Sequence, residues 1–174
     1  MPDVIGPGLR VLFVGINPGR HSGAAGHHFA GPANRFWTVL HLAGFTERRL
    51  PPAEECRLLE RGIGITNLVA RTTAGAADLG REELRAGGLR LAATVDRDRP
   101  AVVAVLGLGA YRTAFARPRA AVGPQAEGIA GSALWVLPNP SGLQAHYQLP
   151  ELVALFSKLR KAVDRAAPPP MAVP

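Results

Sequence analysis

Four short apolar runs divide the sequence and are typical of buried strands. They are residues 10–15 (RVLFVG), 64–70 (GITNLVA), 101–106 (AVVAVL) and 133–137 (ALWVL). The first and third are almost wholly apolar, as in strands of a parallel sheet that is covered on both faces. The second is interrupted by the polar residues Thr66 and Asn67. We therefore expect four strands in one buried sheet.

Helical patterns lie between these runs. Residues 34–43 place Phe36, Val39 and Leu40 at helical spacing. Residues 81–97 predict a long amphipathic helix whose first turn is acidic, which suits the positive end of the helix dipole. Further helices are expected at 51–61, 107–116 and 149–165. Alternating strands and helices predict the α/β class, here a single three-layer α/β/α domain around a central, mainly parallel sheet.

The expected domain spans residues 8–165. Residues 1–7 are then an N-terminal extension, and residues 166–174 (AAPPPMAVP) a disordered C-terminal tail. In parallel α/β sheets, ligands bind beyond the carboxyl ends of the strands. Three loops fit that position, at 15–34, 66–80 and 138–146, and the first is long enough to suggest a function.

Charge changes this picture in one respect. The 174 residues carry a net charge of +7, and lysine occurs only at Lys158 and Lys161, so arginine dominates. No carboxylate lies between Asp3 and Glu47, and only Glu127 lies between residues 99 and 150. Such segments are typical of polyanion-binding loops, but buried strands and turns are also poor in charge. Both interpretations stay open.

Several classes of protein are not expected. Cys56 is the only cysteine, which excludes an internal disulfide and a four-cysteine cluster and favours a reduced cytoplasmic compartment. The sequence contains no run of 18 apolar residues, so no membrane span is predicted. The N-terminus lacks the basic region of a secretory signal. His21, His27 and His28 have no carboxylate or cysteine near them in the sequence, so we expect no metal.

The pentapeptide Gly15-Ile16-Asn17-Pro18-Gly19 follows the first strand. Pro18 restricts Asn17 to an extended or turn conformation. An amide held there accepts a hydrogen bond from water but cannot take up a proton as a general base. The alternative is a structural Asx turn.

Two other loops carry apolar candidates. Phe29 lies in a polar loop, where a nucleobase stacked on it would gain ~1–3 kcal/mol, or where it pins the loop to the core. Pro138-Asn139-Pro140-Ser141-Gly142-Leu143 predicts a rigid turn with an apolar tip. Such a tip enters a base stack in some DNA-binding proteins, or it packs inward.

Two weaker signals concern glycine and serine. Gly107 and Gly109 begin a dinucleotide fingerprint, but Arg112 replaces its third glycine. A phosphate contact at the start of the following helix stays a candidate. Ser141 does not lie in a G-x-S-x-G elbow, which argues against a serine hydrolase.

Together these segments resemble the mismatch-specific uracil-DNA and thymine-DNA glycosylases. Residues 15–19 are similar to the first active-site motif of that family, and residues 139–143 to its second motif in the bacterial branch. Residues 32–37, 43–46 and 86–88 match in order, so the resemblance runs from about Gly8 to Leu159. Residues 26–28, 64–67 and 71–73 are more similar to the eukaryotic branch.

The resemblance implies a uracil-DNA glycosylase-like fold and cleavage of the N-glycosidic bond of a flipped pyrimidine. It implies that Asn17 positions the attacking water. The implied base pocket contains Gly15, Ile16, Ser22, His28, Phe29 and Asn67, with His28 as an extra donor. The implied DNA wedge contains Asn139, Pro140, Ser141, Gly142, Leu143 and Gln144. Candidate phosphate contacts are Arg20, Gly107, Gly109 and Arg112.

The partner implied is double-stranded DNA with a mismatched or damaged pyrimidine, bound by a monomer without cofactor or metal. The protein is expected in the cytoplasm, associated with the nucleoid through DNA. After Leu143 the wedge continues Gln144-Ala145-His146, where bacterial relatives carry a Ser and then an Arg. Ala145 therefore lacks a charged side chain that would help to fill the gap, which weakens the wedge. Asp78 is interpreted as a turn or cap residue rather than a catalytic acid. A damage-binding protein and a small-molecule nucleotide enzyme are the alternatives.

Overall fold

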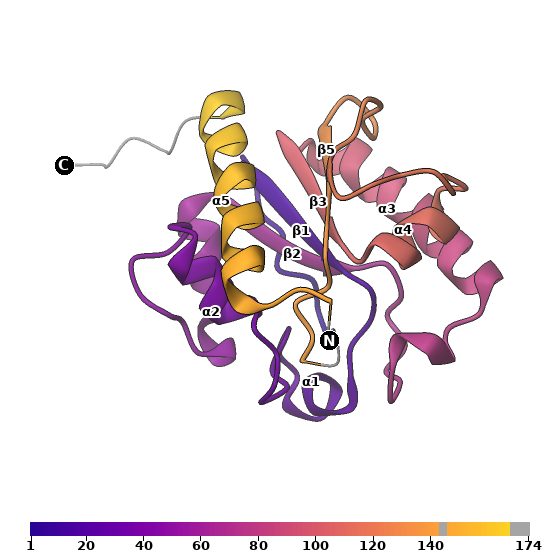
Figure 1. The fold of residues 1–174 in the computed structure, drawn as a ribbon, viewed down its shortest axis with the longest axis horizontal. Helices are drawn as coiled ribbons and strands as arrows, with labels where there is room; N and C mark the ends of the chain where they lie inside the picture. Colours follow the sequence, from indigo (N-terminus) through magenta and orange to yellow (C-terminus); the bar gives the residue numbers. More distant parts are fainter. Residues whose placement is uncertain (143–145, 168–174) are drawn as a thin grey trace.

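A central five-stranded sheet organises the chain in the computed structural model, which describes residues 1–142 and 146–167 (Figure 1). The strand order is β2-β1-β3-β5-β4. The first four of these strands pair in parallel, and β4 pairs antiparallel with β5 at one edge. The strands are β1 Val11–Gly15, β2 Ile63–Asn67, β3 Val102–Leu106, β4 Gly123–Pro124 and β5 Ala133–Leu137.

Helices cover both faces of this sheet. Figure 1 shows α2 and α5 on one side and α3 and α4 on the other. The helices are α1 Arg20–Ala25, α2 Phe36–Leu42, α3 Arg81–Asp98, α4 Leu108–Ala114 and α5 Leu149–Ala166, with the 3₁₀ helices η1 Pro52–Arg61 and η2 Ala76–Asp78. The predicted three-layer α/β/α fold is confirmed.

The apolar runs are continuous because each strand packs on both sides. In β1, Phe13 belongs to the core cluster that includes α2 and α5, whereas Leu12 and Val14 belong to the cluster that includes α3 and α4. Successive side chains of a strand point to opposite faces. The Phe13 ring lies 5.8 Å from the Phe156 ring of α5 in a stacked arrangement. Two separate cores therefore hold the sheet, one on each face.

The chain departs from the expected elements where they are short. The run expected at 64–70 ends as a strand at Asn67. Beyond it, the Leu68 and Val69 amides donate to the carbonyls of Gly15 and Ile16 (both 2.9 Å) as the chain leaves the sheet. Helix α1 lies inside the segment expected as a loop, since its six residues (RHSGAA) have no apolar periodicity.

The N-terminal segment contacts the sheet. Val4 is buried and forms an antiparallel bridge with Ile65 of β2, with N···O distances of 2.9 and 2.8 Å. At the other end, α5 continues to Ala166, and residues 168–174 of the expected tail lie outside the described residues. The predicted domain limits remain predictions.

Within residues 1–142 and 146–167, no helix is both long and apolar enough to cross a membrane.

Candidate functional site

A cavity of about 540 Å³ opens beyond the carboxyl ends of β1 and β2. Its walls come from all three loops expected to carry function. The lining residues predicted from the sequence are Ile16, Asn17, Arg20, Ser22, His28, Phe29, Asn67, Asn139, Ser141 and Gly142. The topology thus brings together residues from positions 16 to 142, because parallel strands end at the same edge of the sheet.

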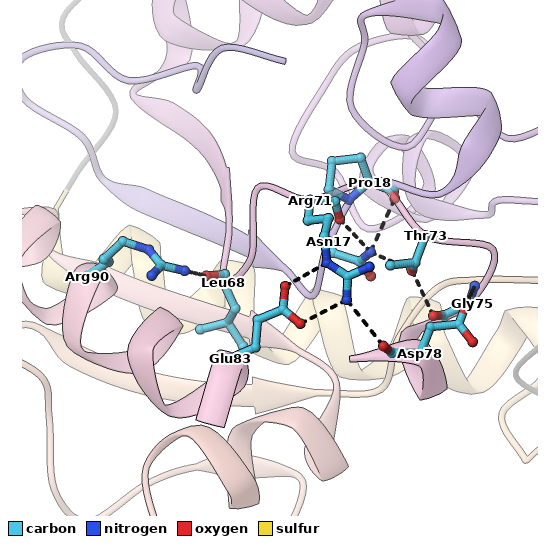
Figure 2. A network of polar contacts seen from close by, with 9 residues as sticks. All are labelled: Asn17, Pro18, Leu68, Arg71, Thr73, Gly75, Asp78, Glu83 and Arg90. Carbon is cyan, nitrogen blue, oxygen red and sulfur yellow. Dashed lines mark hydrogen bonds and ion pairs between the residues drawn. The ribbon is translucent and has the colours of Figure 1, made fainter. Parts of the chain in front are cut away.

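The side chain of Asn17 is held by a network of oxygen acceptors (Figure 2). Its Nδ2 donates to the Arg71 carbonyl (2.9 Å) and to Thr73 Oγ1 (2.7 Å), and it lies 3.3 Å from the Pro18 carbonyl. Thr73 Oγ1 in turn donates its own proton to the Gly75 carbonyl (2.7 Å). Both N–H groups of the Asn17 amide therefore have partners in the protein.

These partners fix which way the Asn17 amide points. The Arg71 carbonyl can only accept, and the Thr73 hydroxyl has already used its single proton on Gly75. An oxygen of Asn17 in the same place would face two acceptors. The amide nitrogen consequently faces the 71–75 loop, and Oδ1 is left to accept a hydrogen bond from water or a ligand in the cavity.

An ion pair supports the loop that holds Asn17. Arg71 Nε donates to Glu83 Oε1 and Arg71 Nη2 to Glu83 Oε2 (both 2.9 Å), and Nη2 also donates to the Asp78 carbonyl (3.2 Å). The hydrogen bond from Arg71 lowers the pKa of the Glu83 carboxyl. Figure 2 shows Glu83 reaching from α3 to the Arg71 guanidinium.

Asp78 has a local structural contact. Its Oδ2 accepts a hydrogen bond from the Gly75 amide (3.1 Å), which caps η2. The interpretation of Asp78 as a turn or cap residue is therefore confirmed.

Phe29 lies between the core and the cavity. Its ring stacks on Phe36 with the centroids 4.0 Å apart, so it does hold the loop to the core. It also lines the cavity, so the two interpretations of this residue are compatible. Its backbone is left-handed (φ 53°), a conformation that costs a non-glycine residue about 1–3 kcal/mol. Such strain is more frequent at functional sites than elsewhere.

Glycine at position 15 leaves room for the cavity wall at β2, because it has no side chain. Gly15 pairs with Asn67 in the β1–β2 register. A Cβ on Gly15 would lie 2.4 Å from Asn67 Oδ1, closer than atoms can approach. Gly15 itself does not line the cavity, but it leaves the room in which the Asn67 amide lies.

His28 is buried, and both of its ring nitrogens have partners. Nε2 lies 3.0 Å from the Pro2 carbonyl, and Nδ1 lies 3.3 Å from Asn67 Nδ2. Burial lowers the pKa of this imidazole. The resemblance implied that His28 offers an extra donor to the base. In the structure, both ring nitrogens face protein partners, Pro2 and Asn67, and the donor role stays a prediction.

Ile16 and Ser22 shape the rest of the pocket. The Ile16 carbonyl accepts a hydrogen bond from the Val69 amide (2.9 Å). A Cβ on Gly107 would lie 2.8 Å from Ile16 Cδ1, so this glycine permits the close approach of β1 and β3 ends. Ser22 Oγ accepts from the Ala30 amide (3.0 Å), which ties α1 to the loop that carries Phe29.

The described part of the second motif, residues 139–142, forms a turn that is held by hydrogen bonds. Asn139 Oδ1 accepts from the Ser141 amide (3.1 Å), and Pro140 accepts from the Arg35 amide. Pro140 is not among the cavity-lining residues. Gly142 packs so closely on Ala33 that a Cβ would lie 2.6 Å from the Ala33 carbonyl oxygen. The predicted wedge residues Leu143 and Gln144 lie outside the described residues.

The guanidinium of Arg35 joins both stems of that turn. It donates to the Ser141 carbonyl (3.0 Å) before residues 143–145 and to the Tyr147 carbonyl (2.7 Å) after them. A longer contact reaches the Pro140 carbonyl (3.4 Å). Charge-assisted hydrogen bonds of this kind are the stronger ones in proteins.

The candidate phosphate contacts differ in position. Arg20 lies at the cavity, exposed, and makes no side-chain hydrogen bond or ion pair with the described residues. Arg112 donates twice to the Ala120 carbonyl (3.0 and 2.6 Å). Gly107 and Gly109 line a neighbouring cavity of about 660 Å³, which shares Ile16, Ala76 and Asn139 with the first.

Some residues of the site were not predicted as such. Met1, Thr73 and the residues 74–76 line the cavity, and Arg35 and Glu83 support it from outside. The motif match at 71–73 was a signal for Thr73, but no periodicity or spacing indicates that the first residues of the chain reach the site. Among the described residues, His, Cys, Asp and Glu do not gather in groups of three that could hold a metal ion.

Comparisons with known proteins agree with this architecture. A family model described as "Uracil DNA glycosylase superfamily" matches residues 2–164. A solution NMR structure described as a "putative Uracil DNA glycosylase" from Methanosarcina acetivorans is similar to this chain at a TM-score of 0.61 and 18% sequence identity. The similarity covers 91% of this chain and 96% of that one. At this identity, the second match speaks for the fold alone.

Proposed function

The chain belongs to the uracil DNA glycosylase superfamily, and from this premise we propose that it is a monofunctional, mismatch-specific DNA glycosylase. In this proposal it binds duplex DNA as a monomer and flips out a uracil, or a thymine or ethenocytosine, that lies opposite guanine. It then hydrolyses the N-glycosidic bond and leaves an abasic site, the first step of base excision repair.

The orientation of Asn17 carries the proposal. Its amide nitrogen is committed to the Arg71 carbonyl and the Thr73 hydroxyl, so Oδ1 is the atom available to the cavity. A carboxamide oxygen there can accept a hydrogen bond from a water molecule and hold one of its lone pairs toward a sugar carbon. An amide does not take up the proton, so its contribution is position rather than general base catalysis.

The chemistry follows from the leaving group. The bond between C1′ of the deoxyribose and N1 of uracil breaks first, and its electron pair leaves with the base as an anion. The water held by Asn17 attacks the resulting oxocarbenium-like carbon and releases a proton to solvent. Because the uracil anion is a fair leaving group, the reaction needs little acid or base assistance. Backbone N–H groups directed at the departing base, such as that of Ile16, would stabilise its charge.

Base recognition is proposed to depend on Phe29 and Asn67. Phe29 is held against Phe36 and offers an aromatic surface to the cavity for stacking. Asn67 has both a donor and an acceptor, as the Watson–Crick edge of uracil does. His28 acts behind Asn67, and Ser22 lies where the resemblance sets the substituent at pyrimidine C5.

Mismatch reading is proposed to lie in the turn from Asn139 to Gln144. In the family resemblance, Gly142 and Leu143 fill the gap left by the flipped base and contact the opposite guanine. The contacts of Arg35 with the stems of this turn support that proposal, since a wedge must resist being pushed aside. Arg20 and, at the start of α4, Gly107, Gly109 and Arg112 are the proposed phosphate contacts.

Single-turnover cleavage on one labelled duplex tests the proposal. The target position carries G·U, A·U, G·T or single-stranded U, and Asn17→Ala is measured beside the unmodified protein. We expect cleavage of G·U, and more slowly of G·T, with Asn17→Ala slower by roughly 100-fold and its DNA affinity little changed. Gln125→Ala removes an amide at a remote turn and serves as the matched control.

The outcomes separate the alternatives. Equal cleavage of every uracil context contradicts mismatch reading but not the glycosylase activity. Tight binding of mismatched DNA without cleavage favours the damage-binding protein instead. Cleavage that survives Asn17→Ala would remove the role of Asn17.

A further inference from the structure

The first residues of the chain reach the base pocket through a buried histidine. Met1 lines the cavity, and the Pro2 carbonyl oxygen lies 3.0 Å from His28 Nε2. Only 1% of His28 is exposed to solvent. On its other side, His28 Nδ1 lies 3.3 Å from the side-chain amide of Asn67, which also lines the cavity. A continuous polar chain therefore connects Pro2 to Asn67.

The hydrogen-bonding roles along this chain can be assigned by elimination. A backbone carbonyl only accepts, so His28 Nε2 must carry a proton. Burial disfavours the charged imidazole and lowers its pKa, so the ring is neutral near pH 7 and Nδ1 carries a lone pair. The atom of Asn67 that faces Nδ1 must then be a donor. This is the amide nitrogen, as found in the structure.

The assignment leaves the amide oxygen of Asn67 on the other side. Oδ1 lies beside Gly15, within 2.4 Å of the place that a Cβ would occupy, and the Phe29 ring edge lies 3.3 Å from the same place. The acceptor of Asn67 is thus directed toward the end of β1 and the aromatic wall of the cavity. A flip of the amide would set its oxygen against the lone pair of His28 Nδ1.

We infer that the N-terminal segment, residues 1–4, is a specificity element: through the Pro2 carbonyl and the tautomer of His28, it locks the Asn67 amide with its oxygen available to the base. An acceptor there complements a pyrimidine that has a proton on N3, as uracil and thymine do. Cytosine and ethenocytosine have no hydrogen-bond donor at N3. Cytosine would face the Asn67 oxygen with the N3 lone pair, and ethenocytosine with the carbon bonded to N3. The base-reading part of this inference rests on the proposed function.

The surroundings of His28 support a neutral, fixed ring. Its backbone amide donates to Glu55 Oε2 (2.7 Å), and Glu55 also accepts from His27 Nδ1 (3.0 Å). The Glu55 and Asp3 carboxylates favour a charged imidazole, whereas the N-terminal amine opposes it. Asp3 is engaged with Thr66 Oγ1 (2.7 Å), and Val4 anchors the segment on β2. Burial outweighs these charges, so the tautomer is set by the Pro2 carbonyl.

The first test measures the tautomer directly and needs no enzyme activity. Nitrogen-15 NMR of the full chain distinguishes a protonated from an unprotonated ring nitrogen. We expect His28 to be a single Nε2–H tautomer at pH 7. A chain that starts at Val4 should show a mixture of the two tautomers, and its Asn67 side-chain amide protons should exchange faster. An Nδ1–H tautomer in the full chain, or an unchanged His28 in the shortened one, overturns the lock.

The second test measures specificity. Single-turnover rates are compared for G·U and G·ethenocytosine duplexes with the full chain, the chain that starts at Val4 and His28→Phe. We expect the preference for uracil to fall by about tenfold in both variants, the effect of one lost hydrogen bond. His27→Phe, which changes a neighbouring histidine outside the cavity, should keep it. A preference that is unchanged in His28→Phe contradicts the inference.

If the proposed glycosylase function is wrong, the two tests give a different pattern of results than if the inferred lock is wrong. A protein without glycosylase activity gives no rates for any variant, while the NMR experiment still reports the His28 tautomer. If the protein is inactive but His28 has a single fixed tautomer, the inference that the N-terminal segment locks the Asn67 amide stands. Only the role of this lock in base recognition is then contradicted. Thermal unfolding of each variant shows whether a lower rate reflects loss of the fold.

Discussion

At the scale of single residues, Gly15 leaves no room for a side chain beside Asn67. A methyl group there would lie 2.4 Å from Asn67 Oδ1 and 3.3 Å from the Phe29 ring. We predict that Gly15→Ala displaces the Asn67 amide and lowers the single-turnover rate on G·U by roughly tenfold, the effect of a lost hydrogen bond. The measurement is the excision rate at saturating enzyme, together with the thermal midpoint.

Gly80→Ala is the matched control for this change. A Cβ on Gly80 meets no atom within 4 Å, and its backbone is extended. The same methyl group should therefore leave both the rate and the midpoint nearly unchanged. A Gly15→Ala protein with the unmodified rate would show that the Asn67 oxygen does not touch the base.

The buried imidazole of His28 predicts a pH-dependent stability. Its folded pKa is lowered by burial from the ordinary value of 6.5, so the unfolded chain binds the proton first as the pH falls. The contribution to stability is complete above about pH 6.5 and is lost as the pH falls through the window between 6.5 and the lowered pKa. His28→Phe should flatten this part of the profile. Thermal midpoints between pH 4.5 and 8 measure it, with His27→Phe as the control.

Single residues also show how much of the candidate site could be predicted from the sequence. Asn17 was predicted as a candidate because it follows an apolar strand, and Asn67 because of the family resemblance; the structure brings both to one cavity. The partners of these amides were not predictable. Pro2 and His28 are 26 residues apart, and Asn17 and Thr73 are 56 residues apart. Contacts at such separations depend on the register of β1 and β2, which the sequence does not state.

At the scale of elements, α3 positions the loop that orients Asn17. Glu83 of α3 binds the Arg71 guanidinium through both carboxylate oxygens, and the Arg71 carbonyl accepts from Asn17. We predict that Glu83→Gln weakens this anchor and slows excision by on the order of fivefold, with little change in DNA affinity. Glu82→Gln alters the adjacent exposed carboxylate and should have no effect. A fall in DNA affinity instead of rate would contradict the positioning role.

The turn after β5 depends on α2 in a similar way. Arg35 precedes α2 and donates to carbonyls on both sides of residues 143–145. We predict that Arg35→Met, which keeps the aliphatic stem, lowers excision from duplex DNA about tenfold and the free energy of unfolding by about 2 kcal/mol. Cleavage of single-stranded uracil should change much less, because no base stack has to be opened.

The excision rates of Arg35→Met on duplex and on single-stranded DNA together decide that prediction. Equal losses on both substrates would mean that Arg35 supports the fold rather than the wedge. Arg85→Met removes an exposed arginine that pairs within α3 and is the control for charge alone.

The elements that the sequence predicted are those with strong apolar patterns. The strands β1, β3 and β5 and the helices α3 and α5 lie close to their expected bounds, because a sheet buried on both faces requires continuous apolar runs. Short elements escaped prediction. Helix α1, strand β4 and η2 contain two to six residues, which is too short for an apolar periodicity to show.

At the scale of the whole molecule, the arginine at the cavity differs from those of α3 in its ion pairing. The net charge is +7, yet the arginines of α3 are balanced by acids on the same helix, as in the pairs Arg85–Glu82 and Arg97–Asp98. Arg20 at the cavity has no such partner among the described residues. A polyanion at the carboxyl ends of the strands therefore meets in Arg20 a positive charge that no carboxylate offsets among the described residues.

This arrangement predicts the salt dependence of DNA binding. Each phosphate neutralised by an arginine releases condensed counterions, so the logarithm of the binding constant falls with the logarithm of salt concentration. Arg20→Ala should reduce the slope by about 1 and weaken binding equally for matched and mismatched duplexes. Arg97 is paired with Asp98 at the end of α3 farthest from the cavity, so Arg97→Ala should leave the slope unchanged. Equal slopes for the two variants would mean that DNA does not lie across the Arg20 side of the cavity, and the docking face would have to be sought nearer to Arg112.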